Sequence, residues 1–124
     1  MRFMMFMMPN IPVEGEWMPT AEAMAEMTKY NETLTKAGVL LDLDGLHPQH
    51  EGARVEFSKG KSSVIDGPFT EAKEMIGGYW LIQAKSKEEA VEWAKRCPAD
   101  GCMIEVRQVF EMDEFPPDVQ AVAK

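Results

Sequence analysis

Asp66, in the predicted turn Asp66-Gly67-Pro68, is the strongest candidate for a catalytic residue in this sequence. An aspartate at the end of a strand can serve as a general acid or base when it borders a partly buried cleft. The same aspartate can instead accept hydrogen bonds from the backbone N–H groups of its own turn. The sequence leaves both roles of Asp66 open.

Two histidines, His47 and His50, stand in a segment that follows Asp42 and Asp44. Imidazoles with carboxylates can ligate a divalent metal, but no helix or strand fixes the spacing of this set. We therefore predict no metal site and no cofactor. Imidazole exchanges protons near neutral pH. His47, which follows a Gly-Leu pair, is the second candidate for acid–base chemistry after Asp66.

Charged and aromatic side chains near the turn are candidates for contact with a polar organic ligand. Adjacent residues of a strand point to opposite faces, so one of Tyr79 and Trp80 faces the helices. The other is expected to line the opposite face, where an aromatic wall suits a small molecule. The alternatives are a solvated surface for the charged residues and a core position for the aromatic ones. The candidate ligand-binding residues are Arg54, Phe69, Glu71, Lys73, Tyr79 and Trp80.

Hydrophobic patterning predicts the elements that must position these residues. A helix is expected to begin at Thr20 and to stop at Gly38, and a second begins at the capping box of Ser86 and Glu89 and stops at Pro98. A hairpin turn is expected at Lys59-Gly60. The predicted strands are residues 2–8, 39–43, 54–57, 61–65, 76–84 and 103–110.

This order of elements predicts a ferredoxin-like α+β sandwich, in which two helices cover one face of an antiparallel sheet. The two strands expected at the centre, residues 2–8 and 76–84, are apolar on both faces. Two helices cover only one face, and soluble monomers rarely leave so large an apolar patch in water. We therefore expect a homodimer that packs sheet against sheet.

Residues 66–74, which read Asp-Gly-Pro-Phe-Thr-Glu-Ala-Lys-Glu, resemble the DGPFAETKE signature of the YCII-related (DGPF-domain) family. They depart from it at Thr70, where the family has alanine, and at Ala72, where it has threonine. The resemblance extends over residues 1–112, which leaves residues 113–124 as a C-terminal tail. It implies a ferredoxin-like fold, a dimeric α+β barrel and a cleft near the dimer interface, and it supplies no defined reaction. Further segments that are similar to the family are Tyr30-Asn31-Glu32, Gly77-Gly78-Tyr79 and Glu92-Trp93-Ala94.

The composition of the chain limits which partners it can bind and in which compartment it is expected. The 124 residues include 13 basic and 21 acidic side chains, and the resulting net charge of −8 disfavours nucleic acid. No apolar run approaches the roughly 20 residues of a membrane span, and no secretory signal is visible. We expect a cytoplasmic protein in which Cys97 and Cys102 are reduced thiols.

Two functions fit these features. The first is a small-molecule enzyme with isomerase, lyase or hydrolase-like activity, in which Asp66 is the general acid or base in a cleft of the dimer. The second is a non-catalytic dimer, a small-ligand-binding or regulatory protein, that uses the same cleft. An enclosed pocket with Asp66 in its wall favours the enzyme.

Overall fold

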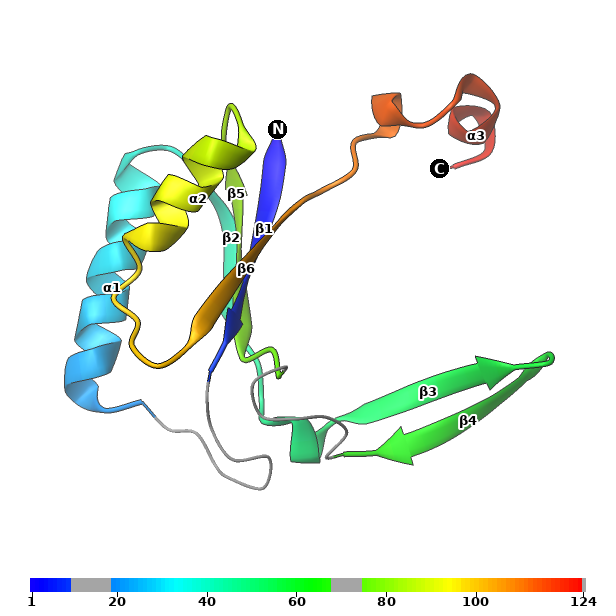
Figure 1. Ribbon diagram of the computed structural model, residues 1–124, viewed down its shortest axis with the longest axis horizontal. Coiled ribbons are helices and arrows are strands. Elements are labelled where there is room, and N and C mark those ends of the chain that lie inside the picture. Colours follow the sequence, from blue (N-terminus) through cyan, green and yellow to red (C-terminus); the bar gives the residue numbers. More distant parts are fainter. Residues whose placement is uncertain (10–18, 68–74, 124) are drawn as a thin grey trace.

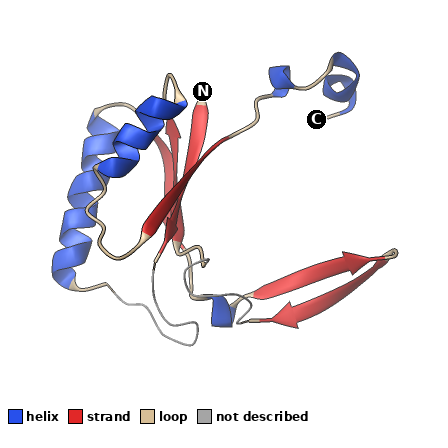
Figure 2. Ribbon diagram, in the orientation of Figure 1, coloured by secondary structure: helices blue, strands red, loops and turns tan. Residues whose placement is uncertain are grey.

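The computed structural model describes residues 1–9, 19–67 and 75–123. The helices and strands follow one another in the predicted order (Figures 1 and 2). The elements are β1 (Arg2–Met8), α1 (Ala21–Lys36), β2 (Leu40–Gly45), the 3-10 turn η1 (Gln49–Glu51), β3 (Ala53–Ser58), β4 (Lys61–Asp66), β5 (Gly78–Gln83), α2 (Lys87–Lys95), β6 (Met103–Gln108), the 3-10 turn η3 (Met112–Glu114) and α3 (Pro117–Val122).

The main sheet has four strands in the order β2-β5-β1-β6, and every neighbouring pair is antiparallel. Both long helices cover one face of it (Figure 1). This is the predicted ferredoxin-like α+β arrangement, with β1 and β5 at the centre. Strands β3 and β4 form a separate two-stranded sheet. The four-stranded sheet of one chain stays open and does not close into a barrel.

Both helices begin at the expected capping residues. The Thr20 hydroxyl accepts a hydrogen bond from the Ala23 N–H at 3.1 Å, and the Ser86 hydroxyl accepts one from the Glu89 N–H at the same distance. Each bond satisfies a backbone N–H that the first turn of a helix leaves without a partner. Helix α1 ends at Lys36, two residues before Gly38, whose φ of +74° is one that glycine adopts without strain. The capping residues therefore fix where both helices lie in the sequence.

The core lies between the sheet and the two helices. Trp80 on β5 meets Tyr30 on α1 edge to face, with ring centroids 5.7 Å apart and an interplanar angle of 87°. The Trp80 Nε1–H donates to Asn31 Oδ1 at 2.8 Å, and the Tyr30 hydroxyl donates to the Trp93 carbonyl of α2 at 2.7 Å. Burial raises the pKa of Tyr30, so its hydroxyl stays protonated and keeps this bond. The largest side chains that are fully buried here are Phe3, Met5, Leu34 and Ile82.

The other face of the sheet carries alternate residues of the same strands. Met4 and Phe6 of β1 lie there beside Leu81 and Tyr79 of β5, and all four are half-buried. The β3–β4 hairpin and the C-terminal segment both project from this side, away from the helices (Figure 1). We call this surface the open face. It has the apolar centre that led us to expect a second copy of the chain.

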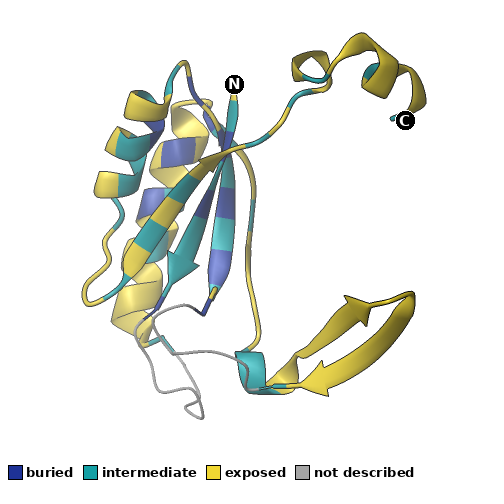
Figure 3. Ribbon diagram, turned by 45° about the vertical axis from the view of Figure 1, so that its right-hand side comes forward, coloured by how far each residue is buried: buried dark blue, intermediate teal, exposed yellow. Residues whose placement is uncertain are grey.

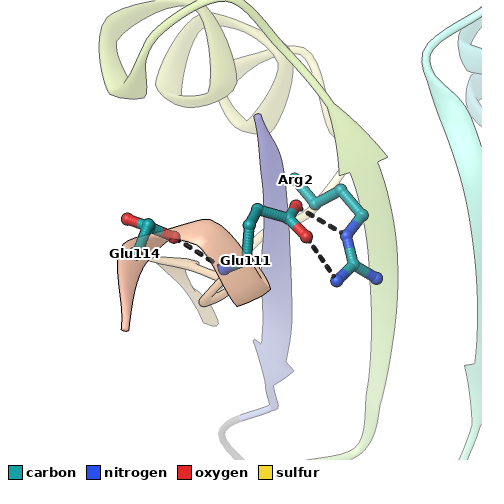
Figure 4. A network of polar contacts seen from close by, with 3 residues as sticks. All are labelled: Arg2, Glu111 and Glu114. Atoms are coloured by element: carbon teal, nitrogen blue, oxygen red, sulfur yellow. Dashed lines mark hydrogen bonds and ion pairs between the residues drawn. The ribbon is translucent and has the colours of Figure 1, made fainter. Parts of the chain in front are cut away.

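The C-terminal segment is joined to β1 by a bidentate ion pair (Figure 4). Arg2 Nε and Nη2 donate to the two carboxylate oxygens of Glu111 at 2.8 and 2.9 Å. The hydrogen bond and the charge of Arg2 lower the pKa of Glu111, so the pair stays charged below the usual range of a glutamate. The Glu111 N–H donates to a Glu114 carboxylate oxygen at 2.6 Å and continues the network into η3. The start of the tail therefore has a defined attachment to the sheet.

Both cysteines, at the end of α2 and before β6, are free thiols. Burial, followed by the negative charge of a Cys102 thiolate, raises the pKa of Cys97 to about 11. Only the thiolate attacks an alkylating reagent, and at pH 8 about one Cys97 in a thousand is a thiolate. We predict that iodoacetamide modifies Cys97 at least about 100-fold more slowly than it modifies free cysteine, and that the rate rises with pH up to about 11.

Fragmentation mass spectrometry of the peptide that contains both thiols measures this rate at Cys97. Unfolding in urea is the control, since it should bring Cys97 to the rate of free cysteine. Rapid modification of Cys97 in the folded protein at pH 8 contradicts the prediction.

Candidate functional site

The Asp66-Gly67 motif lies at the base of the β3–β4 hairpin, against η1. Asp66 is the last residue of β4 and stands opposite Ala53. The Gly67 N–H donates to the Gly52 carbonyl at 3.1 Å. A side-chain carbon added at Gly67 would overlap the Gln49 carbonyl oxygen and would lie 3.1 Å from the His50 Cα. Only glycine fits where these two backbone segments meet. The motif glycine therefore fixes the position of the backbone next to Asp66.

Asp66 itself is exposed. Its carboxylate forms no hydrogen bond or ion pair within the described part of the chain. Among the described residues, the turn therefore supplies no hydrogen-bond donor to this carboxylate. Both roles of Asp66 stay open, because the rest of its turn, from residue 68, lies outside the described residues.

His47 borders a shallow, mainly apolar pocket at the end of the sheet where β1 and β2 finish and β5 begins. The pocket is small and partly open to solvent. His47 Nδ1 lies 3.5 Å from Glu51 Oε2, and the His47 side chain is 88% exposed. Asp66 is not among the described residues of the lining, which are Pro9, Leu46, His47, Pro48, Met75, Ile76 and Gly77.

The segment between the pocket and the motif contains His50, in η1. The Nδ1 atom of His50 is buried and has no hydrogen-bond partner among the described residues. A buried polar atom without a partner costs about 1–3 kcal/mol. The same segment has two contacts. Leu46, His47 and Pro48 line the pocket, and the backbone of Gln49 and His50 lies against Gly67.

A second polar group, whose members the sequence analysis did not bring together, lies on the open face. The Tyr79 hydroxyl is 3.2 Å from Asp42 Oδ2 and 3.3 Å from Asp44 Oδ2. Partial burial, then the hydrogen bonds and negative charges of the two aspartates, raise the pKa of Tyr79. The phenol thus stays protonated, and its O–H group forms hydrogen bonds to both carboxylates. Among the described residues no three acidic, histidine or cysteine side chains are placed to hold a metal ion.

The structure separates several residues that the sequence grouped together. Trp80 is 6% exposed and belongs to the core on the helix side, so its ring does not line the open face. Arg54 lies on β3 opposite Ile65, on the side of the hairpin that faces away from the Ala53–Asp66 pair. The remaining three candidates, Phe69, Glu71 and Lys73, lie outside the described residues. Of the two neighbouring aromatic residues, only Tyr79 is on the open face.

Residues 1–113 match the sequence profile of the YCII-related domain. The chain belongs to this family. It is also 33% identical over 72 residues to an uncharacterised protein of Rhizobium meliloti (strain 1021), a match that covers 58% of each chain. The chain thus spans less than two thirds of that relative's length. No helix within the described residues is long and apolar enough to cross a membrane.

The motif glycine of this YCII-related domain provides a stability test. Gly67→Ala should lower the free energy of unfolding by about 1–3 kcal/mol, because the added methyl group must displace the Gln49 carbonyl. The N–H at position 67 should also exchange faster, since its bond to Gly52 depends on the same close approach. Urea denaturation and hydrogen exchange measure the two effects.

Gly45→Ala is the matched control, because no atom lies within 4 Å of a carbon added at Gly45. Its stability should stay within about 1 kcal/mol of the wild type. Equal stability of the two variants contradicts a steric role for Gly67.

Proposed function

We propose that this protein is a homodimer that binds a small organic molecule in a cleft at the subunit boundary, and that Asp66 acts there as a general acid or base. The observation that carries this proposal is the Asp66 carboxylate, which the described turn leaves unused while Gly67 locks the backbone beside it. An exposed carboxylate beside a backbone segment that is held in place is suited to contact with a ligand.

The open face supports the dimer. Met4, Phe6 and Leu81 form a half-buried apolar strip along its two central strands. Two sheets that pack face to face are about 10 Å apart, and such packing removes the apolar side chains of both copies from water. The free thiols also fit a reducing, cytoplasmic location.

The chemistry of the cleft follows from its side chains. Asp66 as a carboxylate accepts a proton from an acidic C–H or O–H group of the ligand, and His47 supplies a second proton-transfer group near the pocket. Tyr79, whose hydroxyl donates its hydrogen to Asp42 and Asp44, offers its oxygen as an acceptor on the open face. Apolar walls with a few polar groups are typical of small-molecule sites. Isomerase, lyase and hydrolase-like reactions all use such groups.

One observation favours the alternative, a non-catalytic dimer that binds a small ligand or has a regulatory role. Asp66 is exposed and does not line the pocket of the described chain. A solvated carboxylate is a good partner for a cationic or hydroxyl group of a ligand, but it gains little as a catalyst without burial.

Asp66→Asn separates the two functions. Ligands are found by NMR with a library of small organic acids, amides and aromatic compounds, and turnover is followed as the exchange or conversion of their protons in D₂O. A catalytic Asp66 predicts that Asp66→Asn retains ligand affinity but loses turnover by about 100-fold or more. A binding role predicts no turnover by the wild type and weaker affinity of the variant.

Asp113→Asn in the tail is the matched control, because it removes the same charge from an exposed aspartate that is far from Asp66 in the sequence. It should behave as the wild type in both assays. Ligands that bind the wild type, Asp66→Asn and Asp113→Asn equally, with equal turnover, contradict both roles of Asp66.

A further inference from the structure

The β3–β4 hairpin has one apolar side and one mainly polar side. Across the hairpin Val55 stands opposite Val64, and Phe57 opposite Ser62. These pairs share a face with the Ala53–Asp66 pair at the base. The other face carries the pairs Arg54–Ile65, Glu56–Ser63 and Ser58–Lys61. We call the three apolar residues Val55, Phe57 and Val64 the arm face.

The arm face has no partner within the described chain. Phe57 is 78% exposed, Val64 69% and Val55 51%, and every residue of both strands is exposed (Figure 3). A two-stranded hairpin by itself is marginally stable in water. Its turn is nevertheless well formed, because Lys59 and Gly60 have φ values of +50° and +77°, as hairpin turns of the primed type require. A hairpin with a defined register and a bare apolar side indicates a missing partner.

A second copy of the chain fits the position and length of the hairpin. The hairpin leaves the body on the side of the open face, as the C-terminal segment does (Figure 1). Six residues of strand reach about 20 Å, whereas a four-stranded sheet is about 15 Å wide between its outer strands. A chain that covers the open face therefore meets the hairpin, which is long enough to extend along its whole sheet.

The charge of the hairpin also favours a second copy of the chain as its partner. The hairpin, residues 53–66, carries the basic Arg54, Lys59 and Lys61 and the acidic Glu56 and Asp66, a net charge of +1, whereas the whole chain has a net charge of −8. A cationic hairpin is attracted to an acidic surface, and a second copy of this chain provides one.

We propose that each hairpin reaches across the dimer and packs its arm face along the rim of the open face of the other copy. This inference rests on the proposed homodimer and adds which segment reaches across it. Because Asp66 ends β4 at the base of the hairpin, the arm also carries the motif to the subunit boundary. The candidate site is then complete only when the second copy is bound.

Sedimentation velocity over a dilution series tests the arm through Phe57→Ser. Since Phe57 is the most exposed residue of the arm face, this variant should fold normally and raise the dimer dissociation constant at least about tenfold. Ile65→Ser is the matched control, because it removes an apolar side chain of the same hairpin from the opposite face. Its dissociation constant should stay within about threefold of the wild type.

Hydrogen exchange of the wild-type hairpin is a second measurement that needs no variant. Amides of β3 and β4 should exchange slowly in the dimer and rapidly after dilution to monomer. A wild type that is monomeric at 100 µM overturns both the dimer and the arm. A stable wild-type dimer that Phe57→Ser does not weaken, or whose hairpin exchanges as fast as in the monomer, overturns the arm and leaves the dimer standing.

Discussion

Trp80→Ala should lower the free energy of unfolding by about 3–5 kcal/mol, the cost of emptying a buried tryptophan site. Trp80 is 6% exposed, packs against Tyr30 and donates to Asn31 Oδ1, so the truncation removes apolar contacts and leaves the Asn31 oxygen without this donor. Small domains have only about 5–15 kcal/mol of stability. The variant should therefore lie near its unfolding threshold, and urea denaturation followed by circular dichroism measures the loss.

Tyr79→Phe is the control on the next residue of β5. It keeps the ring on the open face and removes only the hydroxyl that contacts Asp42 and Asp44. Exposed hydrogen bonds contribute little, so the expected loss is below about 1 kcal/mol. A Trp80→Ala variant as stable as Tyr79→Phe would show that Trp80 is not part of the core.

The features that the sequence predicted well depend on local signals. Thr20 and Ser86 cap the two helices as expected, because a hydroxyl before an amphipathic segment satisfies a free N–H wherever that segment packs. The turn at Lys59-Gly60 was likewise predicted from a local signal, the two residues that form it. The first strand has the predicted bounds, Arg2–Met8, since its end is fixed by the adjacent Pro9. The strand order follows once these elements are placed, because few topologies connect them.

The polar group on the open face could not be predicted in the same way. Asp42 and Asp44 looked like partners of the nearby histidines, but the register of β2 with β5 sets Asp44 opposite Tyr79. That register shifts between Leu40 and Asp42, an irregularity that strict alternation along β2 does not reveal. Likewise, the close approach of Gly67 to the Gln49 carbonyl joins residues that are distant in sequence. Such contacts depend on how the chain folds back on itself, which no local pattern encodes.

Phe6→Lys should weaken the proposed dimer by about 1,000-fold, because it would place an ammonium group in the apolar interface between two sheets. Phe6 is at the centre of β1, on the open face, with Tyr79 and Glu105 opposite it on the two neighbouring strands. In the monomer the long lysine side chain can reach water from this half-buried position and has Glu105 beside it, so the fold should be preserved. Sedimentation should show a fall from twice the 14.0 kDa chain mass to the mass of one chain.

Met24→Lys is the matched control, since Met24 is a 51% exposed residue of α1, on the opposite side of the molecule from the open face. It introduces the same charge and should leave the dimer intact. The monomeric Phe6→Lys protein also shows where the ligand binds. If the site lies at the subunit boundary, ligand affinity and any turnover that depends on Asp66 are lost together with the dimer. A Phe6→Lys protein that remains as dimeric as Met24→Lys would show that the open face is not the interface, and the barrel formed by two sheets would have to be abandoned.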